Sequence, residues 1–120
     1  DWIARNQQKG EHLVLLGDFN ADESEASVGQ LTQPLPHGET LANSRAKSLN
    51  GTSGPAISYN AFNAFPESGK LIDHIFVSPG FVVKAHAIVA AHENGRVASD
   101  HFPVVALLGL PGRRAQHCAP

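Results

Sequence analysis

The chain contains four short apolar runs separated by polar and glycine-rich segments. Leu13–Leu16, Leu71–Val77 and Pro103–Leu108 are almost continuously apolar, which is typical of buried strands of that length. The residues of the fourth run, Phe81–Val89, alternate instead, which predicts a half-exposed strand. The alternation places Val83, Ala85, Ala87 and Val89 on one face and Lys84 and His86 on the other.

Two helical segments flank the first of these strands. Asp1–Lys9 is predicted to be the end of a helix, with Trp2 and Ile3 on its inner face, because Gly10 follows as a stop signal. A second helix is predicted after the strand, where Asp22 is a good N-cap and Glu25 completes the pattern of a capping box. Its apolar residues are Ala26, Val28 and Leu31, and it ends before Pro34 and Pro36.

The segment beyond the second helix shows no sustained period. Pro34–Pro55 is rich in Gly, Ser, Thr, Asn and Pro, which predicts a long loop. Ile57–Phe62 is a candidate short strand, and Pro111–Pro120 is expected to be a disordered tail. The alternation of strands and short helices predicts a single α/β domain over residues 1–110.

Composition bounds the function without identifying it. The chain has 120 residues, 42% hydrophobic and 17% charged, with a net charge of −2, which favours a folded domain. That charge argues against a protein that binds nucleic acid mainly by neutralising phosphates. A single cysteine, Cys118, excludes an internal disulfide, and no apolar run reaches the roughly 18 residues of a membrane span. Neither the compartment nor the oligomeric state follows from the sequence.

Candidate chemistry lies where the buried strands end. Asp18 and Asn20 follow the first strand two residues apart, so both side chains can point the same way. An ionised carboxylate can orient a water molecule and accept its proton, and an amide adds no negative charge beside an anion. The alternative is that Asp18 begins a simple turn and Asn20 closes it.

A second pair, Asp100 and His101, precedes the last strand. Pro103 restricts Phe102 to extended conformations, which places the pair on a turn. A functional histidine needs a partner on its other ring nitrogen, usually a carboxylate. Asp73 is unusual inside an apolar strand, so we expect its carboxylate within hydrogen-bond reach of His101, with Asp18 and Asn20 opening onto the same cleft. Alternatively, Asp73 caps a turn and Asp100 is solvated.

The three segments also carry a resemblance. GDFN, IDHIFVS and SDHFPV, in this order, resemble the last three motifs of the endonuclease/exonuclease/phosphatase superfamily, which includes exonuclease III, pancreatic-type deoxyribonucleases, inositol polyphosphate 5-phosphatases and neutral sphingomyelinases. The resemblance implies that residues 1–110 are the C-terminal half of a four-layer α/β/β/α sandwich with two packed mixed β-sheets. The family's N-terminal half carries an asparagine and a glutamate that anchor magnesium, so the chain is expected to be a fragment and inactive alone.

The resemblance further implies divalent-metal-dependent hydrolysis of a phosphoester by a nuclease or phosphatase. Asp18 would activate the water, Asn20 and His101 would hold the phosphoryl oxygens, and Asp73 would orient His101. Asp100 would face the metal, Mg²⁺ or Mn²⁺, since oxygen ligands and phosphate substrates favour these ions over zinc.

Two further points bear on the site. Ser58–Phe62 resembles a family segment near the active site, which makes Asn60 a candidate substrate contact. The other histidines match no zinc spacing, and His74 is assigned a structural role because it faces away from Asp73.

The substrate remains open among nucleic acid, inositol phosphate and phospholipid headgroup. An inactive fragment and a degenerate phosphate-binding module are the alternatives to an enzyme. Retention of a water-activating carboxylate argues against the binding module.

Overall fold

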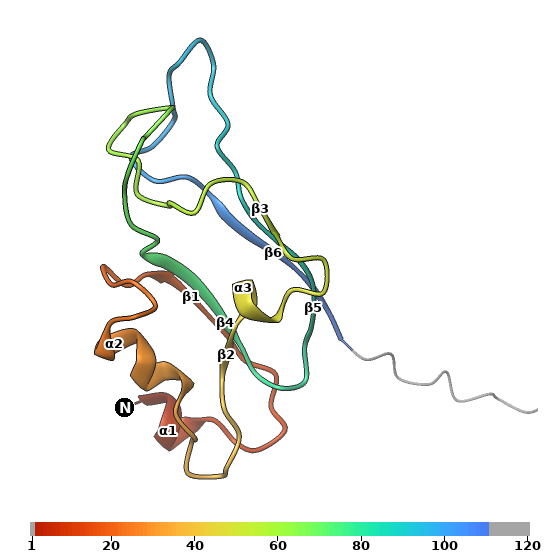
Figure 1. The fold of residues 1–120 in the computed structure, drawn as a ribbon. Coiled ribbons are helices and arrows are strands. Elements are labelled where there is room, and N and C mark those ends of the chain that lie inside the picture. The colour runs from red at the N-terminus through yellow and green to blue at the C-terminus, as the bar shows by residue number, and fades with distance from the viewer. Residues whose placement is uncertain (1, 111–120) are drawn as a thin grey trace, which may run out of the picture.

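Two three-stranded sheets pack against each other in the computed structural model, which describes residues 2–110 (Figure 1). The first sheet has the order β1 (Val14–Asp18), β4 (Asp73–Val77) and β2 (Ala42–Asn43), and all its pairs are antiparallel. The second has the order β3 (Thr52–Ser53), β5 (Val82–Ile88) and β6 (Val104–Gly109), and it is mixed, since β3 runs parallel to β5. The predicted α/β class with two packed sheets is confirmed.

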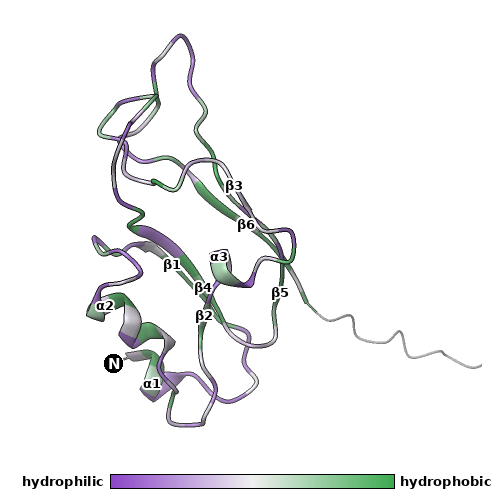
Figure 2. Ribbon diagram, viewed as in Figure 1, coloured by the Kyte–Doolittle hydropathy of each residue, from purple (hydrophilic) through white to green (hydrophobic). Residues whose placement is uncertain are grey.

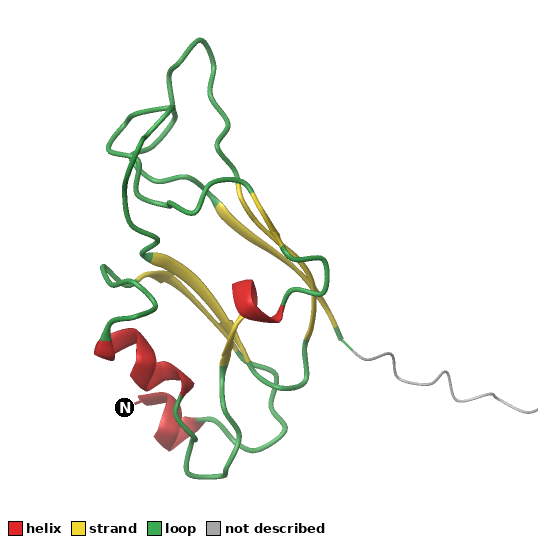
Figure 3. Ribbon diagram, viewed as in Figure 1, coloured by secondary structure: helices red, strands yellow, loops and turns green. Residues whose placement is uncertain are grey.

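The helices are short and pack mainly on the first sheet (Figure 3). They are α1 (Trp2–Asn6), α2 (Ala26–Gly29) with the 3₁₀ turn η1 (Gln30–Thr32) behind it, and α3 (Ser44–Lys47), which contacts both β4 and β5. Ile3 and Val28 bring α1 and α2 onto the core around Phe76. The observed layers are therefore helix, sheet and sheet within the described part of the chain.

Strand β4 lies at the centre of the first sheet and contributes to two cores. Phe76 packs toward the helices, whereas Ile75 and Val77 pack with Val83 between the two sheets. This division follows from the two-residue period of a strand. The same period places Asp73 on the side of Ile75 and His74 on the side of Phe76, and the hydrophilic start of β4 contrasts with its hydrophobic remainder (Figure 2).

The predicted alternation in β5 is wrong beyond Val83. Val83 pairs with Leu108 and Ala85 with Leu107, so Lys84 is an extra residue that forms a β-bulge. The bulge exchanges the two faces, and His86 is buried instead of exposed, with a hydrogen bond of 3.0 Å between its Nδ1 and Thr52 Oγ1. Burial lowers the pKa of His86 from its ordinary value.

Both predicted helix starts need correction. Trp2 is not on an inner face, since it is 68% exposed, whereas Ile3 does pack inward. Glu25 accepts a hydrogen bond from the Asp22 N–H, but the Asp22 carboxylate bonds to Ser24, so only half of the capping box forms. The helix begins at Ala26, after a turn at Asp22 that this side-chain bond to Ser24 holds.

The segment Pro34–Pro55, predicted as a loop, contains β2, α3 and β3. The two strands are only two residues long, and Asn43 caps α3 by accepting the Arg45 N–H. Ile57–Phe62 does not form the expected strand; only Tyr59 pairs, in an isolated bridge with His101. The predicted tail, Pro111–Pro120, lies outside the described residues. No helix within residues 2–110 is long and apolar enough to cross a membrane.

We predict that Gly54→Ala destabilises the fold far more than Gly51→Ala. Both glycines have positive φ, +84° and +69°, where other residues are strained. A Cβ at Gly54 would also lie 1.8 Å from the carbonyl oxygen of Ile88, whereas a Cβ at Gly51 meets nothing within 4 Å. Chemical denaturation should show a loss of roughly 2–5 kcal/mol for Gly54→Ala and about 1–2 kcal/mol for Gly51→Ala. Equal losses would contradict the packing of β3 on β5.

Candidate active site

The candidate site lies at the end of β1 and the start of β4 (Figure 1). Asp18 and Asp73 are directly opposite each other in the antiparallel register, so their side chains share the face that looks toward the second sheet. His101 arrives from that second sheet, three residues before β6. Like charges directly opposite in a sheet repel each other, so this pairing requires a compensating group.

His101 is that group. Its Nδ1 donates a hydrogen bond of 2.7 Å to Asp73 Oδ2, and its Nε2 lies 3.9 Å from Asp18 Oδ2. The expected contact between Asp73 and His101 is therefore present. The second distance is too long for a hydrogen bond, which leaves Nε2 and one Asp18 oxygen facing each other without a direct bond.

Ser58 fastens the two sides of this contact together, a role that the sequence did not indicate. Its backbone carbonyl accepts the Phe102 N–H at 2.7 Å, and its hydroxyl accepts the N–H groups of Ile72 and Asp73 at 3.0 and 3.1 Å. The side chain is completely buried. Ser58 thus links the segment of His101 to the strand of Asp73, and the only sequence signal for it was its place in the family-like segment Ser58–Phe62.

The loop after β1 holds Asp18 in a turn. Asp18 Oδ1 accepts the Asn20 N–H at 2.8 Å, and Asn20 adopts the left-handed conformation with φ of 49°. The simple turn considered from the sequence is thus present, but it occupies only Oδ1 and leaves Oδ2 facing His101. Asn20 is exposed, and its side-chain amide bonds to none of the residues that the structure describes.

The carboxylates shift the protonation of His101. The hydrogen bond to Asp73 raises the pKa of His101 above its ordinary value, and the charge of Asp73 acts in the same direction. The negative charges of Asp18 and Asp100 raise this pKa further, against partial burial, which lowers it.

Asp100 and Asn60 flank the site without joining the central contact. The Asp100 carbonyl accepts the N–H groups of Asn60 and Ala61, and its carboxylate accepts the Ser99 hydroxyl at 3.3 Å. Asn60 is 2% exposed, and its Oδ1 accepts the Phe62 N–H. Its Nδ2 has no hydrogen-bond partner among the described residues. The metal role of Asp100 and the substrate role of Asn60 stay predictions.

The donor set suits a divalent cation. One ligand atom from each of Asp18, Asp73 and His101 can be chosen so that all lie within 4.8 Å of one another. Carboxylate oxygens are ligands that Mg²⁺ and Mn²⁺ prefer, whereas an imidazole nitrogen is more typical of zinc and other transition metals. Within the described residues, Asp100 is not part of this group.

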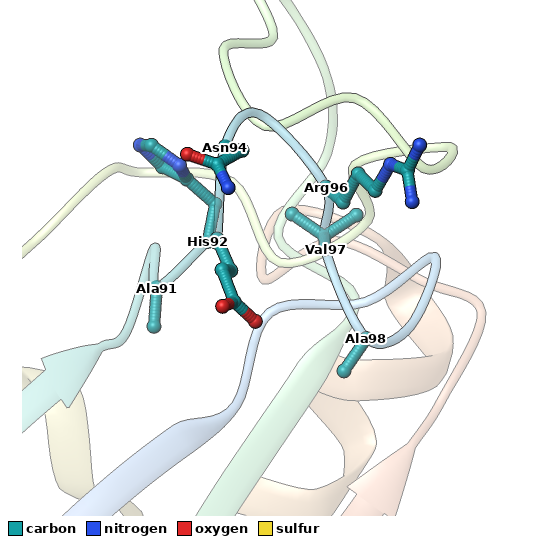
Figure 4. Close-up of a pocket in the computed structure, with 7 residues that line it drawn as sticks. Ala91, His92, Asn94, Arg96, Val97 and Ala98 are labelled. Carbon is teal, nitrogen blue, oxygen red and sulfur yellow. The ribbon is translucent and has the colours of Figure 1, made fainter.

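One hollow borders the site, and a second lies in a neighbouring part of the chain. One, of about 430 Å³, is lined by Gly17, Asp73, Ser99 and His101 among others, but not by Asp18 or Asn20. The expected cleft shared by Asp18, Asn20, Asp73 and His101 stays a prediction, although Asp18 does lie beside His101. A larger hollow of about 790 Å³ lies within the loop between β5 and β6, lined by residues from Ala91 to Ala98 (Figure 4).

The sequence of this chain matches a known protein family. The model of the endonuclease/exonuclease/phosphatase family matches residues 1–101. The chain belongs to this family. The match includes all the site residues predicted from the three motifs, from Asp18 to His101. Comparison with curated proteins gives no match.

Solved structures similar to this chain come from the same family. A mannosyl-6-phosphatase of Bacteroides thetaiotaomicron VPI-5482 is 27% identical, with a TM-score of 0.73 over 91% of this chain and 42% of its own. A family protein from Bacteroides thetaiotaomicron is 29% identical, with a TM-score of 0.66 over 81% of this chain and 37% of its own. Another, from Bacteroides vulgatus, is 26% identical, with a TM-score of 0.72 over 83% of this chain and 37% of its own. The chain thus spans about two fifths of these structures.

We predict that Asp73→Asn lowers the pKa of His101 toward its ordinary value of 6.5. Because the folded pKa is raised, His101 adds stability that is complete at pH below 6.5 and is lost as the pH rises through the folded pKa. NMR titration of the imidazole in parent and variant measures both pKa values. Asp22→Asn, whose carboxyl group bonds to Ser24, is the control and should leave His101 unchanged. An unaltered pKa in Asp73→Asn would contradict the contact.

Proposed function

We propose that this chain forms part of a divalent-metal-dependent phosphoester hydrolase in which water attacks phosphorus. The observation that carries the proposal is the arrangement of His101 between two carboxylates, bonded to Asp73 at 2.7 Å and open toward Asp18 at 3.9 Å. An oriented histidine beside a free carboxylate oxygen supplies the acid–base groups that such a hydrolysis needs.

Asp18 is the proposed base. Its Oδ1 is occupied by the Asn20 N–H, which fixes the rotation of the carboxylate, and its Oδ2 remains available on the side of His101. A carboxylate held in this way orients a water molecule and accepts its proton as the water attacks. Proton transfer of this kind commonly contributes about 10²–10⁴-fold to the rate.

His101 and Asn20 are the proposed contacts to the phosphoryl oxygens. The Asp73 carboxylate accepts a hydrogen bond from Nδ1–H of His101, so we propose that the free Nε2 is the atom that contacts the substrate. The raised pKa favours the protonated ring, which donates to an anionic oxygen. Asn60 is a further candidate contact, because a buried amide donor without a partner is costly unless a ligand satisfies it.

The proposed Mg²⁺ or Mn²⁺ would lie near Asp18, His101 and Asp100. Asp18 and His101 belong to the group whose ligand atoms lie within 4.8 Å of one another, and Asp100 is added because of its place in the family-like motif. Such an ion, when bound, neutralises the negative charge that develops on the phosphoryl oxygens. The carboxylates supply the oxygen ligands that these ions prefer. Asp73 is already engaged by His101, so its proposed role is orientation and not ligation.

The similar structures favour a phosphatase over a nuclease. One of them is a mannosyl-6-phosphatase at 27% identity, and the net charge of −2 on this chain does not favour binding of a polyanion mainly by neutralising its phosphates. Inositol phosphates and phospholipid headgroups remain substrates to test.

We predict that the full-length protein hydrolyses a phosphoester only with divalent metal. The assay uses p-nitrophenyl phosphate, bis-p-nitrophenyl phosphate and plasmid DNA, each with Mg²⁺, with Mn²⁺ and with excess EDTA. Asp18→Asn and His101→Ala should each lower kcat by about 10²–10⁴-fold. The matched controls are Asp22→Asn, in the turn beyond the site, and His12→Ala, before the opposite end of β1; both should retain activity.

Full turnover in EDTA, or an Asp18→Asn variant as fast as the parent, would refute the mechanism. Phosphate binding without turnover in the full-length protein would instead indicate a degenerate binding module. Inactivity of the isolated 120-residue chain stays a prediction, which the same assay on that chain measures.

A further inference from the structure

His74 lies next to Asp73 in β4 but on the opposite face of the sheet, among the residues that pack toward the helices. It is 2% exposed, and its ring is within 6 Å of the rings of Phe19 and Phe76, at centroid distances of 5.8 and 5.9 Å. A ring in such a place fills space in a core. Its buried ring nitrogens also need hydrogen-bond partners, and one of these partners lies in a loop of the site.

That contact reaches the loop that carries the proposed base. His74 Nε2 lies 2.8 Å from the carbonyl oxygen of Ala21, three residues beyond Asp18. We propose that His74 is a positioning residue that holds this loop, and with it Asp18 and Asn20, in the geometry of the site. The inference rests on the proposed function for its effect on catalysis, whereas its effect on the loop is independent of that function.

The hydrogen-bond network assigns the tautomer. A carbonyl oxygen only accepts, so Nε2 must carry a proton and donate it to Ala21. The other nitrogen, Nδ1, lies 3.4 Å from Asn43 Nδ2 and accepts a long hydrogen bond from it. Asn43 uses the same amide nitrogen to donate to Glu23 at 2.9 Å, so its two hydrogens serve two acceptors. Each polar atom of the ring therefore has a partner.

The loop is bonded at both ends to the start of β4, at Ile72 just before the strand and at His74 within it. The Phe19 N–H bonds to the Ile72 carbonyl at 2.9 Å, and the Ala21 carbonyl bonds to His74. Between these points Asn20 takes the left-handed conformation, which costs free energy and persists only where the surroundings enforce it. Losing the Ala21 bond frees one end of this strained residue, whose N–H holds the Asp18 carboxylate.

The test compares three variants of the full-length protein. His74→Leu keeps an apolar side chain but removes the donor, and His74→Gln retains an amide donor that can reach a carbonyl. His86→Leu is the matched control: His86 is also buried, at 4% exposure, but it bonds to Thr52 in the second sheet. The readouts are amide hydrogen exchange at Phe19–Ala21 and the kinetics of p-nitrophenyl phosphate hydrolysis with Mg²⁺.

We expect His74→Leu to accelerate exchange in this loop at least about tenfold and to lower kcat by about 10–100-fold, because small misplacements of a reacting group are costly. KM should change less than kcat. His74→Gln should recover most of both quantities. His86→Leu should lower the melting temperature without selectively changing either readout.

Three results would overturn the proposal. They are unchanged loop exchange in His74→Leu, equal effects of His74→Leu and His86→Leu on kcat, and a Nδ1-protonated tautomer of His74 in ¹⁵N NMR of the parent. The NMR measurement decides the matter even where His74→Leu fails to fold. If the parent shows no hydrolysis, the proposed function fails, while exchange and NMR still test the hold of His74 on the loop.

Discussion

The rest of the site depends on two carboxylates that face each other across neighbouring strands with a histidine between them. Asp18 and Asp73 are paired in register, an arrangement that repulsion disfavours in an ordinary sheet. His101 relieves that repulsion by bonding to one carboxylate and facing the other. Because His101 lies on the segment that leads into β6, this contact also joins the start of β4 to the second sheet. The chemistry of the site and the docking of the sheets therefore share one interaction.

Three consecutive residues of the chain organise this end of the fold. The Ile72 carbonyl accepts a hydrogen bond from the Phe19 N–H, and the Asp73 carboxylate accepts one from His101. The His74 ring donates one to the Ala21 carbonyl. Alternation along β4 sends the last two to opposite faces. This segment thus bonds to the loop of Asp18 on one face of the sheet and to His101 on the other. A shift of β4 by one residue against β1 would place Asp73 and His74 on the wrong faces and break both contacts.

Part of this arrangement could be predicted from the sequence. A carboxylate inside an apolar strand needs a partner, which correctly paired Asp73 with His101. The face of β5 could not be predicted, because the bulge at Lys84 changes the period without a local signal. The strands β2 and β3 were missed because two residues carry no periodicity. Ser58 and Asn43 act through bonds to residues far along the chain, which no local pattern records.

His101 contacts the carboxylates of Asp73 and Asp18 at different distances, 2.7 and 3.9 Å. This difference gives the two aspartates different roles in the site. Asp73 accepts a short bond from Nδ1 and is thereby committed to orienting the ring, since losing that bond would leave a partly buried charge unpaired. Asp18 gives one oxygen to the Asn20 N–H and keeps the other at 3.9 Å from Nε2, beyond bonding distance. A water molecule can bridge two such groups, because it accepts a hydrogen bond from Nε2 and donates one to the Asp18 oxygen. We therefore propose that a substrate enters the network at the gap beside Asp18, and not at the tight contact beside Asp73.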